Sequence, residues 1–204
     1  MSAFETCFGI KGEGFAIVVA DAQMQAHQII AIKSDEDKIM EVEKKLFACN
    51  GPSADRTTFM DYISKNITLY KLRNGVGLST KAAASFTRNE LAQALRSRGP
   101  YQCDLIIAGY DEENGDAELY FMDSYASCAK VNKAAHSYAG NFVHGILDKE
   151  WKTGLTEKEA LNVVKKCITE IKVRFALGRM DAFTIKVVDK NGVRNISQSD
   201  LFLG

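Results

Sequence analysis

The sequence predicts an α+β fold in which two antiparallel sheets stack between outer layers of helices, a four-layer αββα sandwich. Three observations support this prediction. Turn signals at hairpin spacing separate most of the expected strands, and hairpins join antiparallel strands. The expected elements run in the order strands, two helices, strands, helices, strands. Four or five helices are too many for one face of one small sheet, so two stacked sheets are needed to bury them.

The first 50 residues contain four short apolar runs that are typical of strands. These strands are expected over Phe4–Ile10, Phe15–Ala20, Gln28–Lys33 and Lys45–Cys49. The first two flank Lys11–Gly14, whose two glycines indicate a hairpin turn. Asn50-Gly51-Pro52 then ends this block, because these residue types favour turns.

Two helices are expected next. Apolar residues recur at helical spacing from Arg56 to Arg73, and Asn74-Gly75 stops that helix. Ser79 is a favourable N-cap for the second helix, which ends at Gly99-Pro100. Its apolar residues cover about half of its circumference, which predicts a broad buried face.

Strands return in the middle of the chain. They are expected over Asp104–Tyr110 and Ala117–Asp123, around a polar loop at 111–116, with one more short strand within Ser124–Lys133. Leu105-Ile106-Ile107-Ala108 is apolar without alternation, as expected for a strand that is covered on both faces.

Helices and a hairpin complete the chain. A short helix is expected over Asn141–Asp148. Thr156 and Glu159 form a capping box for the clearest helix, which we expect to close at Gly178. The last hairpin turns at Asn191-Gly192, the strongest short hairpin signal.

The composition is typical of a globular protein of one domain. Of 204 residues, 46% are hydrophobic and 25% are charged, and no linker or repeat interrupts residues 1–204. Lys+Arg and Asp+Glu each number 26, and the zero net charge argues against nucleic-acid or membrane-surface partners, which would need a basic excess. We expect no signal peptide and no membrane span.

No metal and no cofactor is expected. The three histidines and five cysteines are widely spaced, and the cysteines include no C-x-x-C pair. These residues are His27, His136, His144, Cys7, Cys49, Cys103, Cys128 and Cys167. Reduced cysteines in the cytoplasm or nucleus are the simplest interpretation. Gly9–Gly14 is only superficially like a phosphate-binding loop, because a strand follows it.

Several strings resemble the beta subunits of the 20S proteasome. Ala108–Asp111, an acidic loop and Leu119–Asp123 are similar to a hairpin of that family. Further family segments are resembled by Phe15–Asp21, by Asp35–Ile39 followed by Leu46–Gly51, and by Gly145–Asp148. Other strings, at Tyr62–Gly75, Ala82–Arg88 and Leu95–Arg98, resemble one type of beta subunit still more closely. The resemblance covers nearly the whole chain, and the order and spacing of these strings together make it specific.

The resemblance implies an N-terminal nucleophile hydrolase fold, the same αββα sandwich that the element order predicts. It also implies assembly with two neighbours in a beta ring, with the opposite beta ring and with alpha-ring subunits. Active members use an N-terminal threonine, released by cleavage of a Gly-Thr bond, as the nucleophile. Counting back from Asp21, that position falls on Glu5, and Thr6 lies one residue late and follows Glu5 instead of glycine.

The other catalytic positions of the family are only partly preserved. Asp21 matches an aspartate near the active centre, and Lys38 approximates the lysine that lowers the pKa of the nucleophile, although it lies one residue further from Asp21. Tyr138 occupies a stretch that is Gly-Ser-Gly-Ser in the family, and a late Asp-x-x-Ser-Gly-Gly stretch is replaced near Phe175–Ala182. Glu5, Asp21, Lys38 and Tyr138 are therefore degenerate positions.

We therefore expect a non-catalytic, structural beta subunit of the core particle in the cytoplasm and nucleus. Two alternatives of other classes stay open. One is an active N-terminal nucleophile hydrolase that uses Ser2, exposed by removal of Met1, or Thr6. The other is a free-standing binding domain that does not assemble.

Overall fold

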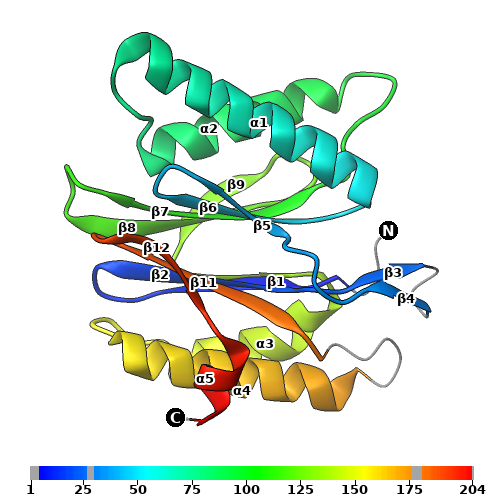
Figure 1. Ribbon diagram of the computed structural model, residues 1–204, viewed down its shortest axis with the longest axis vertical. Coiled ribbons are helices and arrows are strands. Elements are labelled where there is room, and N and C mark those ends of the chain that lie inside the picture. Colours follow the sequence, from blue (N-terminus) through cyan, green and yellow to red (C-terminus); the bar gives the residue numbers. More distant parts are fainter. Residues whose placement is uncertain (1–4, 27–29, 176–180, 204) are drawn as a thin grey trace.

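Two antiparallel sheets lie face to face between two layers of helices (Figure 1). The computed structural model describes residues 5–26, 30–175 and 181–203. Helices α1 (Ser53–Asn74) and α2 (Thr80–Ala94) cover one sheet. Helices α3 (Ser137–Glu150) and α4 (Glu157–Arg174) cover the other, with the short α5 (Gln198–Leu203) beside α4. The predicted αββα sandwich is confirmed.

The first sheet has the strand order β10-β1-β2-β11-β12, and each neighbouring pair is antiparallel. Its strands are β1 (Cys7–Lys11), β2 (Phe15–Asp21), β10 (Lys133–His136), β11 (Phe183–Asp189) and β12 (Gly192–Ile196). Strands from both ends of the sequence therefore meet in one sheet, because β11 pairs with β2 and β12 pairs with β11.

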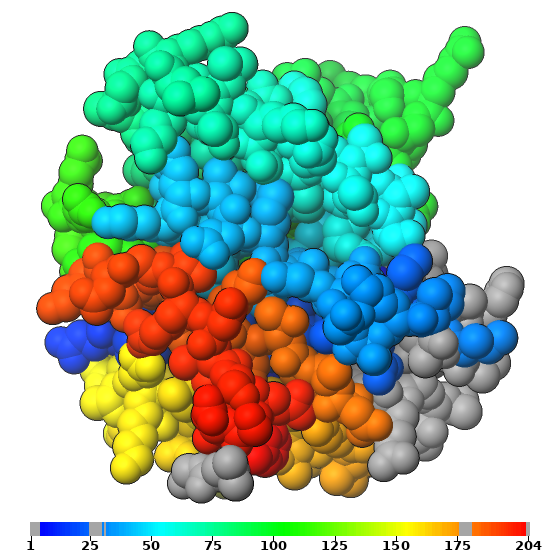
Figure 2. Space-filling view, viewed as in Figure 1, coloured from blue at the N-terminus to red at the C-terminus, as the bar shows by residue number. Residues whose placement is uncertain are grey.

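The second sheet has the strand order β5-β6-β7-β8-β9, again antiparallel throughout. Its strands are β5 (Ile39–Val42), β6 (Lys45–Asn50), β7 (Asp104–Asp111), β8 (Asp116–Met122) and β9 (Cys128–Val131). A separate hairpin, β3 (Met24–Ala26) and β4 (Ile30–Lys33), projects at one end of the sandwich (Figure 1). In the space-filling view, α1, β5, β12 and α5 share one face of the molecule (Figure 2).

The core consists of three apolar layers. One lies between the first sheet and α3 and α4, a second between the second sheet and α1 and α2, and the third between the sheets. Successive residues of a strand point to opposite faces, so each strand feeds two layers. The sheets approach closely at Gly9, where an added Cβ would lie 3.1 Å from side-chain carbons of Ile106 and Leu119.

The local helix signals are confirmed. Ser79 Oγ accepts a hydrogen bond from the backbone N–H of Ala82 at 3.1 Å, and Thr156 and Glu159 form the predicted capping box. Helix α4 ends at Arg174, and Gly178 lies outside the described residues, as does Phe4.

Other boundaries in the prediction were wrong. The strand expected within residues 124–133 is β9, but the next strand, β10, which belongs to the other sheet, was not predicted. Helix α3 begins at Ser137, earlier than the expected Asn141, because Ser137 has a φ of 67° and turns the chain directly from β10 into the helix. The strands β3 and β5 and the helix α5 were not predicted.

Candidate functional site

A buried ion pair joins two of the degenerate positions at the end of β2. The Lys38 Nζ lies 2.8 Å from the Asp21 Oδ2, and both side chains are almost fully buried. Backbone N–H groups of Thr6 and Gln23 also donate to the Asp21 carboxylate, at 2.6 and 3.3 Å. Burial raises the pKa of Asp21, and the Lys38 ammonium opposes this rise. Lys38 therefore reaches Asp21 despite the extra residue in the spacing.

The Glu5 carboxylate is bound by donors from three segments. The backbone N–H of Gly51 donates to Oε2 at 2.7 Å. Arg56 Nη1 donates to Oε1 at 2.9 Å, and Lys38 Nζ lies 3.3 Å from the same oxygen. Only 16% of the Glu5 side chain is exposed, so this carboxylate is held in place by its partners rather than by water.

Arg56 extends the network to a third carboxylate. Its Nη2 donates to Glu36 Oε1 at 2.5 Å, and its Nη1 also donates to the Gly51 carbonyl at 3.1 Å. Burial tends to lower the pKa of Arg56, but the Glu5 and Glu36 carboxylates outweigh burial and raise it. The network thus consists of three carboxylates, one ammonium and one guanidinium, all fixed by mutual contacts.

These groups suit charge pairing better than acyl transfer. Acyl transfer needs a nucleophile and a donor that stabilises the oxyanion. The Gly51 N–H is a donor of that type, but it binds the Glu5 carboxylate. Thr6 is 1% exposed, and its backbone N–H and carbonyl both bond to Asp21. Ser2 lies outside the described residues.

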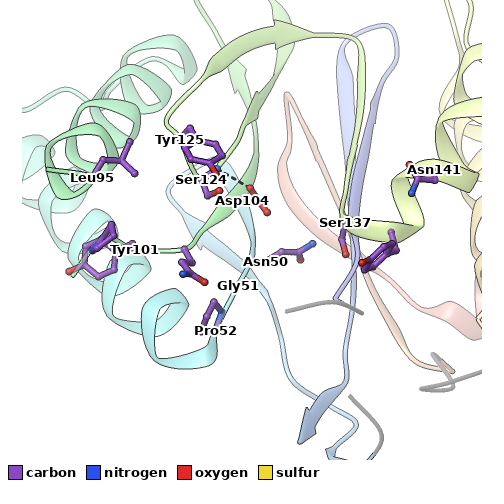
Figure 3. A pocket seen from close by; sticks show the side chains of 13 residues that line it. Asn50, Gly51, Pro52, Leu95, Tyr101, Asp104, Ser124, Tyr125, Ser137 and Asn141 are labelled. Atoms are coloured by element: carbon purple, nitrogen blue, oxygen red, sulfur yellow. Dashed lines mark hydrogen bonds between the residues drawn. The ribbon is translucent and has the colours of Figure 1, made fainter. Parts of the chain in front are cut away.

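A cavity of about 700 Å³ lies beside this network, and Gly51 lines it (Figure 3). Tyr138, the fourth degenerate position, lies in the first turn of α3, is 52% exposed and lines the same cavity. The structure therefore joins Glu5, Asp21 and Lys38 through ion pairs and places Tyr138 at the edge of the neighbouring cavity.

Arg56, Gly51 and Glu36 were not predicted as site residues. Gly51 and Arg56 are 46 and 51 positions away from Glu5 along the chain, and only the tertiary fold brings them together. One signal did exist for Arg56. A cation near the start of a helix opposes the helix dipole, so its presence there favours a nearby carboxylate.

The described part of the chain contains no group of three or more His, Cys, Asp or Glu side chains that could hold a metal ion. Over the same residues, none of the helices combines the length and apolar character that a bilayer crossing requires.

Residues 2–188 match the sequence model of the family described as Proteasome subunit. The chain belongs to the proteasome subunit family. It is 45% identical to Proteasome subunit beta type-2-A of Arabidopsis thaliana, over 94% of this chain and 92% of that protein. It is 42% identical to Proteasome subunit beta type-2 of Dictyostelium discoideum, over 93% and 96% of the two chains.

A relative with another type number is similar over the same length. Probable proteasome subunit beta type-4 of Schizosaccharomyces pombe is 37% identical over 95% of this chain and 99% of that protein. The prediction of a proteasome beta subunit is thereby confirmed. As a beta subunit of the core particle, the chain assembles with other proteasome subunits.

Proposed function

We propose that this beta subunit is non-catalytic and helps to build the beta ring and the proteolytic chamber of the 20S core particle for protein degradation. One observation carries the proposal. Glu5 stands at the nucleophile position, and Gly51, Lys38 and Arg56 hold its carboxylate. An N-terminal nucleophile mechanism needs a hydroxyl or thiol with an adjacent base. Glu5 has neither group, and its carboxylate occupies the place where such a group would lie.

The proposed place of the chain is the fourth position of the beta ring. It would contact two ring neighbours, the opposite beta ring and an alpha-ring subunit, in the cytoplasm and nucleus. The names of its type-2 relatives favour this place. Exposed apolar side chains along α1 are available for such contacts, since a ring interface uses different patches on its two sides.

An active hydrolase that uses Thr6 is the weaker candidate. The Thr6 nitrogen donates to Asp21 as a backbone amide, and the residue is almost fully buried one position beyond Glu5. A free-standing binding domain is disfavoured because the chain belongs to a family of assembling subunits.

The proposal is tested in a core particle in which this chain is unchanged. In the same particle, the N-terminal threonine of each catalytically active beta subunit is replaced by alanine. We expect hydrolysis of fluorogenic peptides to fall to the background rate. A matched particle with one of those threonines restored must be active, which shows that the altered chamber still assembles and admits substrate. Hydrolysis above background in the fully substituted particle would contradict the proposal.

A further inference from the structure

Asn50 has a buried carboxamide without a hydrogen-bond partner. The residue ends β6 and is 3% exposed, and neither its Oδ1 nor its Nδ2 is bonded. A buried amide that lacks partners has lost its bonds to water without replacement, which costs free energy. An apolar residue of similar size would cost less free energy at this position, so the unpaired carboxamide points to a ligand that bonds to it.

The Asn50 side chain points into the open end of the layer between the sheets. Leu46 and Ala48 of the same strand belong to the apolar layer between the sheets, and Asn50 continues that face by strand alternation. The cavity of about 700 Å³ begins there, and the carboxamide extends toward Ser137 on its far side (Figure 3).

Two other polar groups at this cavity already have partners. The Ser124 N–H donates to Asp104 Oδ1 at 2.9 Å, and the Gly51 N–H donates to Glu5. The first turn of α3, a helix of 14 residues, lines the cavity through Tyr138 and Asn141.

The chemistry of these groups selects the ligand. A carboxamide presents a donor and an acceptor side by side, and so does a peptide unit. An anion would satisfy only the Asn50 Nδ2 and would lie near the Asp104 carboxylate, whereas a cation would satisfy only Oδ1. A neutral group that both donates and accepts satisfies both atoms. Leu95, Pro100, Tyr101 and Tyr125 supply apolar walls for its side chains.

We propose that this cavity binds an extended segment of a polypeptide that enters the chamber, with one of its peptide units paired to the Asn50 carboxamide. The volume lies within the range of about 300–1,000 Å³ that is usual for ligand pockets. Gly51 lines the cavity and also contacts Glu5, so the site adjoins the position at which catalytic relatives attack their substrate. The binding needs no bond cleavage, and it is therefore independent of the assignment of the chain as non-catalytic.

The test uses photo-crosslinking in the assembled core particle. A photoreactive phenylalanine analogue replaces Tyr125, which is 80% exposed at the cavity, and a short, terminally blocked, biotinylated peptide with apolar side chains is the probe. We expect ultraviolet light to join the peptide to this chain. Asn50→Leu should lower the apparent affinity about tenfold, equivalent to about 1.4 kcal/mol. N-methylation of the backbone amides of the peptide should lower its apparent affinity by a similar factor.

Two controls separate binding from folding. Asn50→Leu removes an unpaired amide, so the thermal midpoint of the particle should stay the same or rise. Asn114→Leu, in the exposed β7–β8 loop at the other end of β7, should leave labelling unchanged. Labelling that is insensitive to Asn50→Leu would overturn the proposal. A crosslink from position 125 to a neighbouring subunit, with no peptide labelled, would overturn it as well, because a fixed subunit contact would then fill the cavity.

Discussion

Glu5 contributes one carboxylate to a network that joins its own segment to four others. Its partners lie just after β6, in the first turn of α1 and just before β5, and Asp21 at the end of β2 shares the Lys38 ammonium. Charges at such depth are stable only in combination, because removal of one partner leaves another buried and uncompensated. The Glu5 carboxylate thus has a structural role, and this role can be measured.

We predict that Lys38→Met lowers the free energy of unfolding by about 3–5 kcal/mol, because Asp21 and Glu5 then lose their shared cation inside the protein. Lys65→Met is the matched control. It removes an exposed ion pair with Asp61, at 2.6 Å, and should cost less than about 0.5 kcal/mol. Denaturant unfolding of the full chain at one protein concentration measures both values. Equal costs for the two substitutions would show that the buried network does not stabilise this end of the sandwich.

Strands of different sheets are joined by His136, the last residue of β10. Its Nε2 lies 2.9 Å from the Leu105 carbonyl of β7, and its ring stacks on Phe121 of β8 with 4.2 Å between the ring centroids. Burial lowers the pKa of His136 below its ordinary value of 6.5, and the Leu105 carbonyl opposes this change. The neutral ring is therefore the form that fits between the sheets.

This contact predicts a dependence of stability on pH. The unfolded chain takes up the His136 proton near pH 6.5, before the folded chain does, so the contribution of the neutral ring is complete above pH 6.5. It is lost as the pH falls from 6.5 through the lowered pKa of the folded state. We expect His136→Asn to reduce the slope of the free energy of unfolding against pH, as measured by denaturant titrations between pH 8 and 5. An unchanged slope would assign the pH dependence to other groups.

The elements that the sequence predicts well are those with local signals. Ser79, Thr156 and Glu159 act within one turn of their own helices, so their roles can be predicted from neighbouring residues. The strand β5 has four residues and the helix α5 six, too few for a clear hydrophobic period. The resemblance to the family located Glu5, Asp21 and Lys38. The Gly51 contact depends on tertiary packing and has no local signal, and the place of Arg56 at the start of α1 favours a nearby carboxylate without identifying it as Glu5.

At the scale of the whole molecule, α1 and the turn after it expose an apolar surface. It consists of Tyr62, Leu69, Tyr70, Leu72 and Val76, and Leu72 and Val76 are 77% and 62% exposed. A groove of about 380 Å³ lies along the same helix, between Leu69, Tyr70 and Phe86. A surface of this kind marks a contact with another protein, and the zero net charge of the chain does not oppose association.

We predict that the isolated full chain associates in solution and that Leu72→Glu with Val76→Glu reduces this association. The added carboxylates would make burial of the α1 surface unfavourable. Sedimentation velocity at several protein concentrations measures the change, and circular dichroism confirms that both proteins are folded. If the unaltered chain sediments as a stable monomer and binds no other proteasome subunit, the α1 surface is not an assembly surface.

The central claim is that Glu5 fills the nucleophile position, and a covalent inhibitor directed at N-terminal threonines tests it most directly. The inhibitor is added to the intact core particle, and the mass of each subunit is then measured. We predict that the active beta subunits gain the mass of the inhibitor and that this chain does not. Glu5→Thr alone should remain unlabelled, because the new threonine would follow Phe4 in the chain and so lack a free amine. A stoichiometric adduct on the unaltered chain at Thr6, Ser2 or any other N-terminus would contradict the account.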